Sequence, residues 1–434
     1  MKHFYREILP GINLRVVQTD RFKTACFSAS FLMPLNVSDA AKNALIPQVL
    51  RRGTRTLPDM MRISAALNEQ YGARIEPRVR KYGNIQTTGL ICDMVAPECV
   101  PDGAALLADT LTLALEMLLD PATVGDSFVP EYVTSERENL IDLRRSEIND
   151  KLGFAYRSAV GALYHDSGFG AHEFGECDAL EAIDARGLYL HYRERMLRAP
   201  LELFFCGNAS FEQVEAALRP SLVRLGREEE GGATPLGKPN QPQAQELCVH
   251  YDVNQANLLL GLYTPVRAGS VEQPAMHVLS TVLGGGTASK LFLHVREEKS
   301  LCYYTGAKYD KYLQTVFLYS GVDPARVEEA RGEMLRQLMA CQDGDVTETE
   351  LTVAKRNILD DLKTVADSAL GLESYWLGES VMGLSRELAL RMERIRAVTV
   401  DDVVRAARGM INCMTFVLTG EEEQYVRKSL PENS

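Results

Sequence analysis

The chain has 434 residues, of which 46% are hydrophobic and 24% are charged, a composition typical of a globular protein with about two to three domains. Its net charge of −12 at pH 7 argues against nucleic acid or an anionic membrane as a partner, because either partner calls for a basic face. The nine cysteines show no CxxC spacing, and the N-terminal residues MKHFYREILPG lack an apolar run of signal-peptide length. We therefore expect a cytoplasmic protein.

Apolar patterning predicts the first elements of the chain. Residues 22–33 alternate between apolar and more polar positions, which predicts a half-buried strand. Residues 104–120 form the most apolar stretch, but Asp109 and Glu116 interrupt it, and it is shorter than the ~20 residues that span a bilayer. We predict a buried helix there and no membrane span.

Two further helices are indicated by short signals. Leu140, Ile148 and Leu152 have the spacing of one long helix in the first half of the chain. Thr347 followed by Glu350 predicts a capping box, in which each residue satisfies a backbone N–H group at the start of a helix in the second half.

The same order of elements occurs twice along the chain. Each half begins with a strand followed by a proline and a helix, and these helices end in similar segments, LRRGT at 50–54 and LGGGT at 283–287. The next strands align without a gap, KYGNIQTTGLICD at 81–93 with KYLQTVFLYSGVD at 311–323. Each half closes with a helix and an apolar strand that ends in glycine. We therefore predict an internal duplication.

The two copies differ in length. Their offset falls from 230 residues at Asp93 and Asp323 to 213 residues at Gly207 and Gly420, so the first copy carries about 17 more residues in its later part. Between the copies, residues 227–245 are rich in Gly, Pro and Gln and lack a core-forming pattern. This composition is typical of a linker.

Paired strands mixed with long helices predict an α+β fold. We expect two homologous domains, each a mostly antiparallel sheet with helices packed on one face. The predicted boundaries are residues 1–225 for the N-terminal domain, 226–246 for the linker and 247–434 for the C-terminal domain.

The segment GGGTASKLF in the second copy invites comparison with a phosphate-binding loop. Its three glycines are Gly284, Gly285 and Gly286. A phosphate-binding loop needs Gly-x-x-x-x-Gly-Lys-Ser/Thr between a strand and a helix, but here Ser289 replaces the second glycine and Leu291 replaces the hydroxyl residue. The preceding residues have helical rather than strand periodicity. We therefore predict that the glycines join two helices and do not bind a nucleotide.

The sequence VREEKSLCYY after these glycines, within a duplicated chain, resembles the second-domain signature of the pitrilysin/insulinase-type metallopeptidases, a family that includes mitochondrial processing peptidase. The resemblance extends from about residue 10 to residue 425. It implies a family in which zinc is held by an inverted His-x-x-Glu-His on the first helix of the first copy, and by a distant Glu. The glutamate between the histidines activates the bound water.

The resemblance places the three motif residues at Ala44, Pro47 and Gln48, none of which can replace them. The distant zinc-binding Glu aligns with Leu143, or with Asp142 if the register shifts by one residue. Pro47 also removes a backbone donor, at a cost of about 3 kcal/mol in a helix interior. Neither His-x-x-Glu-His nor His-Glu-x-x-His occurs in the chain. We expect no metal site and no cofactor in this chain, and no metallopeptidase activity from it alone.

The second-copy signature is kept. In the family, an Arg and a Tyr seven residues apart hold the substrate carbonyl and the developing oxyanion, and these places match Arg296 and Tyr303. A guanidinium and a phenol can both donate hydrogen bonds at neutral pH, which suits that role. Ser300 replaces the family's usual glycine, at a turn where left-handed backbone geometry favours glycine.

Simpler interpretations of these residues stay open. The charged cluster that contains Arg296 can be the solvated end of a helix, and Tyr303 can be packed in a strand. Tyr304 is a weaker alternative to Tyr303. His165 and His172 lie in a glycine-rich segment, and we expect a plain loop role for them.

The resemblance implies a zinc-less subunit of a heterodimeric peptidase that acts on unfolded peptides. It also implies that Gly284, Gly285 and Gly286, together with the charged segment that follows them, face the peptide substrate. Its partner is expected to be a paralogous subunit that carries His-x-x-Glu-His and the zinc, while this chain adds the Arg/Tyr clamp and half of a peptide chamber. A non-enzymatic scaffold or peptide-binding protein of the same fold is the alternative. A homodimer with metal elsewhere is a third possibility, for which the sequence shows no ligand cluster.

Overall fold

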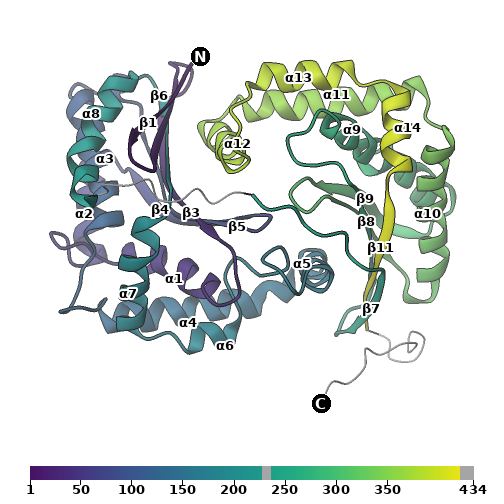
Figure 1. Ribbon diagram of the computed structural model, residues 1–434, viewed down its shortest axis with the longest axis horizontal. Coiled ribbons are helices and arrows are strands. Elements are labelled where there is room, and N and C mark those ends of the chain that lie inside the picture. Colours follow the sequence, from purple (N-terminus) through teal and green to yellow (C-terminus); the bar gives the residue numbers. More distant parts are fainter. Residues whose placement is uncertain (227–235, 421–434) are drawn as a thin grey trace. The chain divides into compact units, whose positions relative to one another are not determined.

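The computed structural model describes residues 1–226 and 236–420, and the chain divides into two compact units (Figure 1). Unit 1 consists of Met1–Ser146, Asp166–Gly237 and Thr364–Ser385. Unit 2 consists of Glu147–His165, Lys238–Lys363 and Arg386–Ser434. Residues 227–235 of the predicted linker, and residues 421–434 of the predicted second domain, lie outside the described residues.

Unit 1 is built on a six-stranded sheet. All neighbouring strands are antiparallel except β2 and β6, which are parallel. The strands lie in the order β1 (Lys2–Leu9), β2 (Ile12–Gln18), β6 (Leu201–Gly207), β3 (Thr24–Pro34), β5 (Ile85–Val95) and β4 (Arg74–Tyr82). The strand predicted at residues 22–33 is β3.

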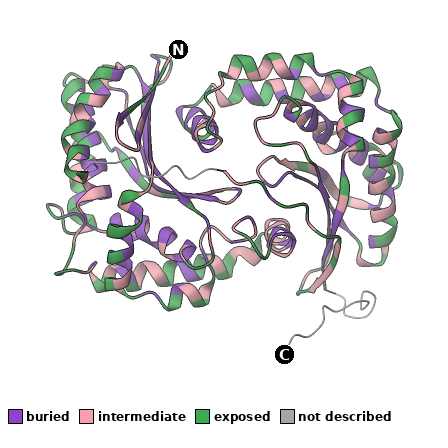
Figure 2. Ribbon diagram, viewed as in Figure 1, coloured by how far each residue is buried: buried purple, intermediate pink, exposed green. Residues whose placement is uncertain are grey.

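Most helices of unit 1 cover one face of this sheet and bury a large apolar core (Figure 2). They are α1 (Ala40–Leu50), α2 (Met60–Glu69), α3 (Gly103–Leu119), α4 (Pro130–Ser146), α6 (Cys177–Glu181), α7 (Ala185–Glu194) and α8 (Phe211–Leu222). The buried helix predicted at residues 104–120 is α3, whose leucines contribute to that core. Among the described helices, none combines the length and the apolarity that a membrane crossing requires.

Unit 2 repeats this topology. Its five strands lie in the order β7 (Gln245–His250), β11 (Ile411–Thr419), β8 (Ala256–Tyr263), β10 (Thr315–Val322) and β9 (Cys302–Asp310). This order reproduces β2-β6-β3-β5-β4, and the β7–β11 pair is again parallel while the other pairs are antiparallel. The α+β fold and the duplication predicted from the sequence are therefore confirmed.

The helices of unit 2 form the corresponding layer and bury a second apolar core. They are α9 (Gln273–Gly284), the π-helical segment Leu291–Glu298, α10 (Val327–Asp343), α11 (Glu348–Val365), α13 (Leu388–Ala397) and α14 (Val400–Arg408). The predicted capping box is present, because Thr347 Oγ1 accepts from the Glu350 backbone N–H at 3.2 Å and the Glu350 carboxylate accepts from that of Thr347 at 2.8 Å.

One helix in each unit comes from the other half of the sequence. α5 (Lys151–Leu163) follows α4 in the first copy but packs on β8 and β11 of unit 2. α12 (Ala369–Val381) follows α11 in the second copy but packs on β3 and β6 of unit 1. Because β3 corresponds to β8 and β6 to β11, the exchange is reciprocal. In unit 1, α12 contacts the sheet face opposite the main helix layer, since Leu32 packs on it while Phe31 points into the main core.

The long helix predicted from Leu140, Ile148 and Leu152 is two helices. α4 ends at Ser146, a 3₁₀ turn covers Glu147–Asn149, and α5 begins at Lys151. Asp150 caps the new helix, because its carboxylate accepts a hydrogen bond from the Gly153 backbone N–H at 3.0 Å. The apolar spacing continued across this break, so periodicity alone could not reveal it.

α12 is docked on unit 1 through buried charged groups. Glu373 is 1% exposed and accepts hydrogen bonds from the Arg80 guanidinium at 2.8 and 3.2 Å, and from the Ser28 hydroxyl at 2.9 Å. Farther along the helix, the buried Arg15 guanidinium lies over the Trp376 ring, 4.5 Å from its centre. α12 is therefore docked by one buried ion pair and one cation–π contact, although Arg15 Nε has no hydrogen-bond partner among the described residues.

α5 is docked on unit 2 through phenol hydroxyls. The Tyr156 hydroxyl donates to Asp310 at 2.9 Å, and its ring packs edge-on against Phe317 with ring centres 4.9 Å apart. Tyr164, at the end of the helix, donates to the Leu313 carbonyl at 2.8 Å and lies 2.8 Å from the Thr315 hydroxyl. Burial raises the pKa of Tyr164, so this hydroxyl is a neutral donor at ordinary pH.

Candidate functional site

The three places of the zinc motif lie on α1. Ala44 is fully buried, Pro47 is buried inside the helix, and Gln48 is half-buried. A methyl group, a pyrrolidine ring and an amide offer neither the imidazole pair nor the carboxylate that a zinc site of this type needs. The residues present therefore do not fit zinc.

Pro47 leaves one carbonyl of α1 without its usual donor. In a regular helix the N–H of residue 47 would bond to the carbonyl of Asn43, four residues earlier, but proline has no N–H. The Thr88 hydroxyl on β5 donates to that carbonyl at 2.7 Å instead. The predicted cost of a proline in the helix interior is thus partly offset by one side chain of the neighbouring strand.

A neutral polar network lies beside the motif places, on the buried side of α1. The amide of Asn43 donates to Gln86 at 2.9 Å, and its oxygen lies 2.7 Å from His191 Nε2. Gln86 in turn donates to the carbonyls of Ala40 at 3.0 Å and Glu173 at 2.6 Å. Burial lowers the pKa of His191, which favours the neutral imidazole. Sequence reasoning missed this network, although Asn43 in an otherwise apolar helix was a signal for it.

The place of the distant zinc-binding glutamate lies on α4. Both Leu143 and Asp142, the two registers considered, are exposed. Across residues 1–226 and 236–420, no three His, Cys, Asp or Glu side chains gather in a way that could hold a metal ion.

The Arg/Tyr signature lies in unit 2, on the π-helical segment Leu291–Glu298 and the first residues of β9. Arg296 is 44% exposed, and its guanidinium lies over the Phe292 ring, 4.7 Å from the centre. Tyr303 is 63% exposed. The two elements pack together, but no hydrogen bond joins the two side chains in the described part of the chain. Both polar groups can reach a ligand, and their catalytic role stays a prediction.

The neighbouring Tyr304 has a structural role in unit 2. Its hydroxyl donates to the Asn257 side chain on β8, and its ring lies where a side chain at Gly321 would have to sit. Burial raises the pKa of this phenol. Of the two tyrosines, Tyr303 is therefore the more accessible candidate.

The turn between these elements has the left-handed geometry that the sequence predicted. Ser300 has φ of +49°, which is rare for a residue other than glycine. The Leu301 N–H bonds to the Val295 carbonyl at 2.9 Å, and the Arg326 guanidinium donates to the Ser300 carbonyl at 2.9 Å. The surrounding hydrogen bonds hold the turn in this conformation.

The three glycines end α9 and lead to the π-helical segment, so they join two helices as predicted. A Cβ atom at Gly284 would lie 2.2 Å from the Ala307 backbone nitrogen on β9, so only glycine allows this approach. Gly285 accepts a hydrogen bond from Asn357 at 3.2 Å, and Gly286 has φ of +135°. Close packing therefore requires glycine at Gly284 and the positive φ favours it at Gly286, while the assignment of all three to substrate binding stays a prediction.

The lysine of GGGTASK is not positioned to bind a phosphate. Lys290 is 3% exposed, and its ammonium group lies 2.9 Å from the Glu350 carboxylate. It forms a buried ion pair that joins the segment to α11.

The two histidines of the glycine-rich segment contact backbone groups nearby. His165 Nδ1 lies 3.2 Å from the Ala162 carbonyl, and His172 Nδ1 accepts from the Phe174 backbone N–H at 3.1 Å. These contacts fit the loop role predicted for them.

Comparisons with known proteins agree with this geometry. The chain matches the family described as "Peptidase M16 inactive domain" over residues 188–358. It is 26% identical over 416 residues to the "Probable inactive metalloprotease YmfF" of Bacillus subtilis, with 95% of this chain and 96% of that protein covered. A conserved protein from Enterococcus faecalis has a similar structure, with a TM-score of 0.88, 25% identity and coverage of 97% and 99% of the two chains. An M16 inactive-domain structure from Pseudomonas fluorescens gives a TM-score of 0.81 at 14% identity, covering 98% and 100%.

Proposed function

The chain belongs to the M16 peptidase family as an inactive metalloprotease homologue, and we propose that it is the zinc-less subunit of a heterodimeric peptidase. The partner is a paralogous subunit with His-x-x-Glu-His, which holds zinc and activates the water that cleaves the peptide. This subunit supplies half of the peptide chamber and the Arg/Tyr clamp. The proposed location of the pair is the cytoplasm.

One observation carries the proposal: Arg296 and Tyr303 are exposed, while the zinc places on α1 hold Ala44, Pro47 and Gln48. The helix that would carry the metal ligands is formed and packed, but it lacks the imidazole and carboxylate groups that bind zinc and activate water. The segment that would bind the substrate carbonyl keeps both of its donors.

The chemistry of the two donors suits a clamp on a developing oxyanion. The guanidinium of Arg296 stays charged at any ordinary pH and offers fixed N–H donors. The phenol of Tyr303 offers one O–H donor. Donors aimed at charge that appears in the transition state speed acyl transfer by about 100- to 1000-fold each.

The first test is the composition of the purified assembly. The chain, purified from its native cells with a tag, is expected to bring a similar-sized protein that carries His-x-x-Glu-His, with about one zinc per pair by metal analysis. The chain purified alone is expected to hold no stoichiometric zinc. Stoichiometric zinc and peptide cleavage by the chain alone would contradict the proposal.

The second test separates a clamp from a scaffold. In the assembled pair, Arg296→Ala and Tyr303→Phe should each lower peptide turnover by about 10- to 1000-fold, because each removes one oxyanion donor. Arg356→Ala and Tyr251→Phe are matched controls on exposed residues of unit 2, and they should leave turnover unchanged. Unchanged turnover in all four variants would favour the alternative, a non-enzymatic scaffold or peptide-binding subunit.

A further inference from the structure

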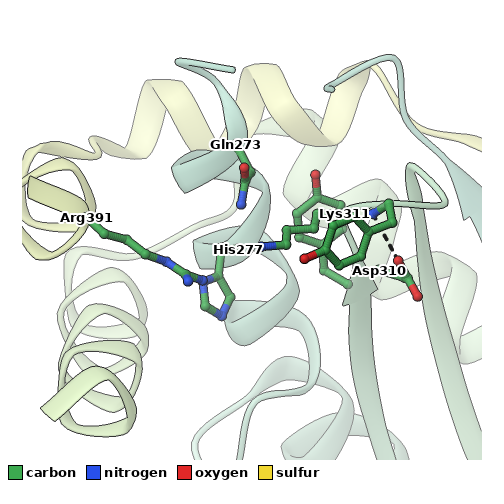
Figure 3. Close-up of a pocket in the computed structure, with 7 residues that line it drawn as sticks. Gln273, His277, Asp310, Lys311 and Arg391 are labelled. Atoms are coloured by element: carbon green, nitrogen blue, oxygen red, sulfur yellow. Dashed lines mark hydrogen bonds between the residues drawn. The ribbon is translucent and has the colours of Figure 1, made fainter. Parts of the chain in front are cut away.

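Unit 2 contains a cavity of about 230 Å³ that the signature segment does not use. Three elements form it: the first turns of α9, the tip of the β9–β10 hairpin and the start of α13 (Figure 3). Its volume is smaller than the ~300–1,000 Å³ of pockets for drug-sized ligands, and it is close to the liquid volume of about eight water molecules. A small ligand is therefore the appropriate occupant to consider.

Positive charge gathers at this cavity. Figure 3 shows the Arg391 guanidinium and the Lys311 ammonium both directed toward the ring of His277. A second, smaller pocket shares His277 and Arg391 with this cavity and is also lined by Arg386 and Arg394. The ligand that such a site attracts is an anion, because guanidinium and ammonium groups bind carboxylate and phosphate oxygens through charge-assisted hydrogen bonds.

Neutral hydrogen-bonding groups complete the lining. Burial, then Arg391 and Lys311, lower the pKa of His277 to about 4, so its imidazole is neutral at pH 7 and has one N–H to donate. Gln273 Oε1 accepts from the Gly269 backbone N–H at 2.6 Å, which leaves the amide NH₂ group facing the cavity. The buried Tyr309 hydroxyl has no hydrogen-bond partner among the described residues. A buried donor without a partner is costly, and a bound anion would supply the acceptor.

The carboxylate that lines the cavity is already engaged. Asp310 accepts hydrogen bonds from the Tyr156 hydroxyl at 2.9 Å and from the backbone N–H groups of Tyr312 at 3.0 Å and Leu313 at 3.1 Å. These bonds commit Asp310 to the hairpin turn and to α5. A metal cation does not fit the site. The lining offers one imidazole as a ligand, and the positive charges of Arg391 and Lys311 beside it would repel a cation.

The equivalent place in unit 1 is built differently. Lys81, which aligns with Lys311, donates to the backbone carbonyls of Phe169 at 2.7 Å and Ala171 at 2.8 Å. Those carbonyls belong to the 13-residue connection between α5 and α6, whereas the corresponding connection between α12 and α13 spans only residues 382–387. In unit 2 the connection is shorter, and Arg391 near the start of α13 lines the cavity together with Lys311.

We propose that this cavity binds a small oxyanion, a carboxylate or phosphate group, with Arg391 and Lys311 as the charged donors and His277, Tyr309 and Gln273 as neutral donors. The site is separate from the Arg296/Tyr303 signature and does not depend on the proposed peptidase role. A free small anion and the C-terminal carboxylate of a peptide share this chemistry.

Calorimetric titration of the purified full chain tests the site. The probes are inorganic phosphate, acetate, and a short peptide prepared with a C-terminal carboxylate and again as the C-terminal amide. One probe at least should bind saturably in a 1:1 ratio. Arg391→Gln should weaken that binding by about tenfold or more, because it removes a charge-assisted bond. Arg396→Gln, an exposed arginine on the same helix that does not line the cavity, should change it by less than about twofold.

The pattern of binding identifies the source of the anion. Binding of phosphate or acetate supports a free small anion, and binding of the peptide acid but not its amide supports a peptide terminus. A bound anion should also raise the midpoint at which His277 titrates by NMR, since it offsets the nearby positive charges. The proposal is overturned if no probe binds saturably at millimolar concentration, or if Arg391→Gln and Arg396→Gln weaken binding equally.

Discussion

The two units use the same topology but hold their exchanged helices with different chemistry. In unit 1, α12 is docked by the Glu373–Arg80 ion pair, with both groups largely withdrawn from water. In unit 2, the equivalent helix α5 is docked by the hydroxyls of Tyr156 and Tyr164. The two copies therefore place this helix at the same position on the sheet but hold it with different side-chain contacts. Removing half of a buried ion pair should cost far more than removing a neutral hydroxyl, so the comparison can be tested residue by residue.

The largest effect is expected at Glu373. Glu373→Ala should lower the free energy of unfolding by about 3–5 kcal/mol in urea denaturation, because it leaves the Arg80 guanidinium buried without its carboxylate. The matched control is Asp367→Ala, which breaks the exposed Arg21–Asp367 pair just before the same helix and should cost less than about 1 kcal/mol. The double variant Arg80→Met/Glu373→Leu should recover most of the loss. Equal costs for Glu373→Ala and Asp367→Ala would show that burial of this pair is unimportant.

The first helices of the two copies give the second comparison. Aligned on LRRGT and LGGGT, α9 has Ser280 where α1 has Pro47, so only α1 needs an outside donor. Thr88→Val should cost about 1–3 kcal/mol in thermal or urea unfolding, because the buried Asn43 carbonyl loses its hydrogen bond. In a Pro47→Ala background the restored N–H replaces the hydroxyl, and the cost of Thr88→Val should fall below about 1 kcal/mol. The same cost in both backgrounds would disprove the compensation.

The docking of α5 should be less sensitive than that of α12. Tyr164→Phe removes a hydroxyl bonded to the Leu313 carbonyl and should cost about 0.5–1.5 kcal/mol in urea unfolding. The cost is modest because Thr315 Oγ1 also donates to that carbonyl, at 3.0 Å, and keeps it satisfied. A loss as large as that of Glu373→Ala would mean that the two helices are held equally strongly.

The smallest effect is expected at the turn before β9, and it is stabilising. The corresponding turn of unit 1 has left-handed geometry at Tyr71 and Gly72, whereas unit 2 uses Ser300 at φ of +49°. Ser300→Gly should raise the unfolding free energy by about 0.5–1 kcal/mol, since glycine adopts this conformation without the Cβ penalty. Ser300→Ala keeps the Cβ atom and should give no gain in the same melting experiment.

Much of the fold could be predicted because the chain is duplicated, so that an element recognised in one half supported the same element in the other half. The gapless match of residues 81–93 with 311–323 placed β5 and β10, and the left-handed turn at Ser300 followed from the family's glycine. Loss of the zinc ligands could be read directly, because a methyl, a ring and an amide cannot replace imidazole and carboxylate. These features depend on residue type and local spacing, which a sequence displays.

The exchange of α5 and α12 could not be predicted, since periodicity shows which side of a helix is buried but not against which sheet. Glu373 and Arg80 resemble ordinary surface charges in the sequence, and their burial depends on a contact between residues 293 positions apart. The cavity beside His277 was missed for the same reason, because its donors come from three separate segments. Long-range packing brings such residues together, and no local pattern records it.

The reciprocal exchange bears on how the chain folds as it is made. Synthesis runs from the N-terminus, yet unit 1 includes residues 364–385. Until that segment leaves the ribosome, one face of the first sheet exposes Arg15 and Arg80 without the helix that covers them. Truncations that end before residue 364 should therefore leave the N-terminal unit unfinished, although every one of its own strands is present.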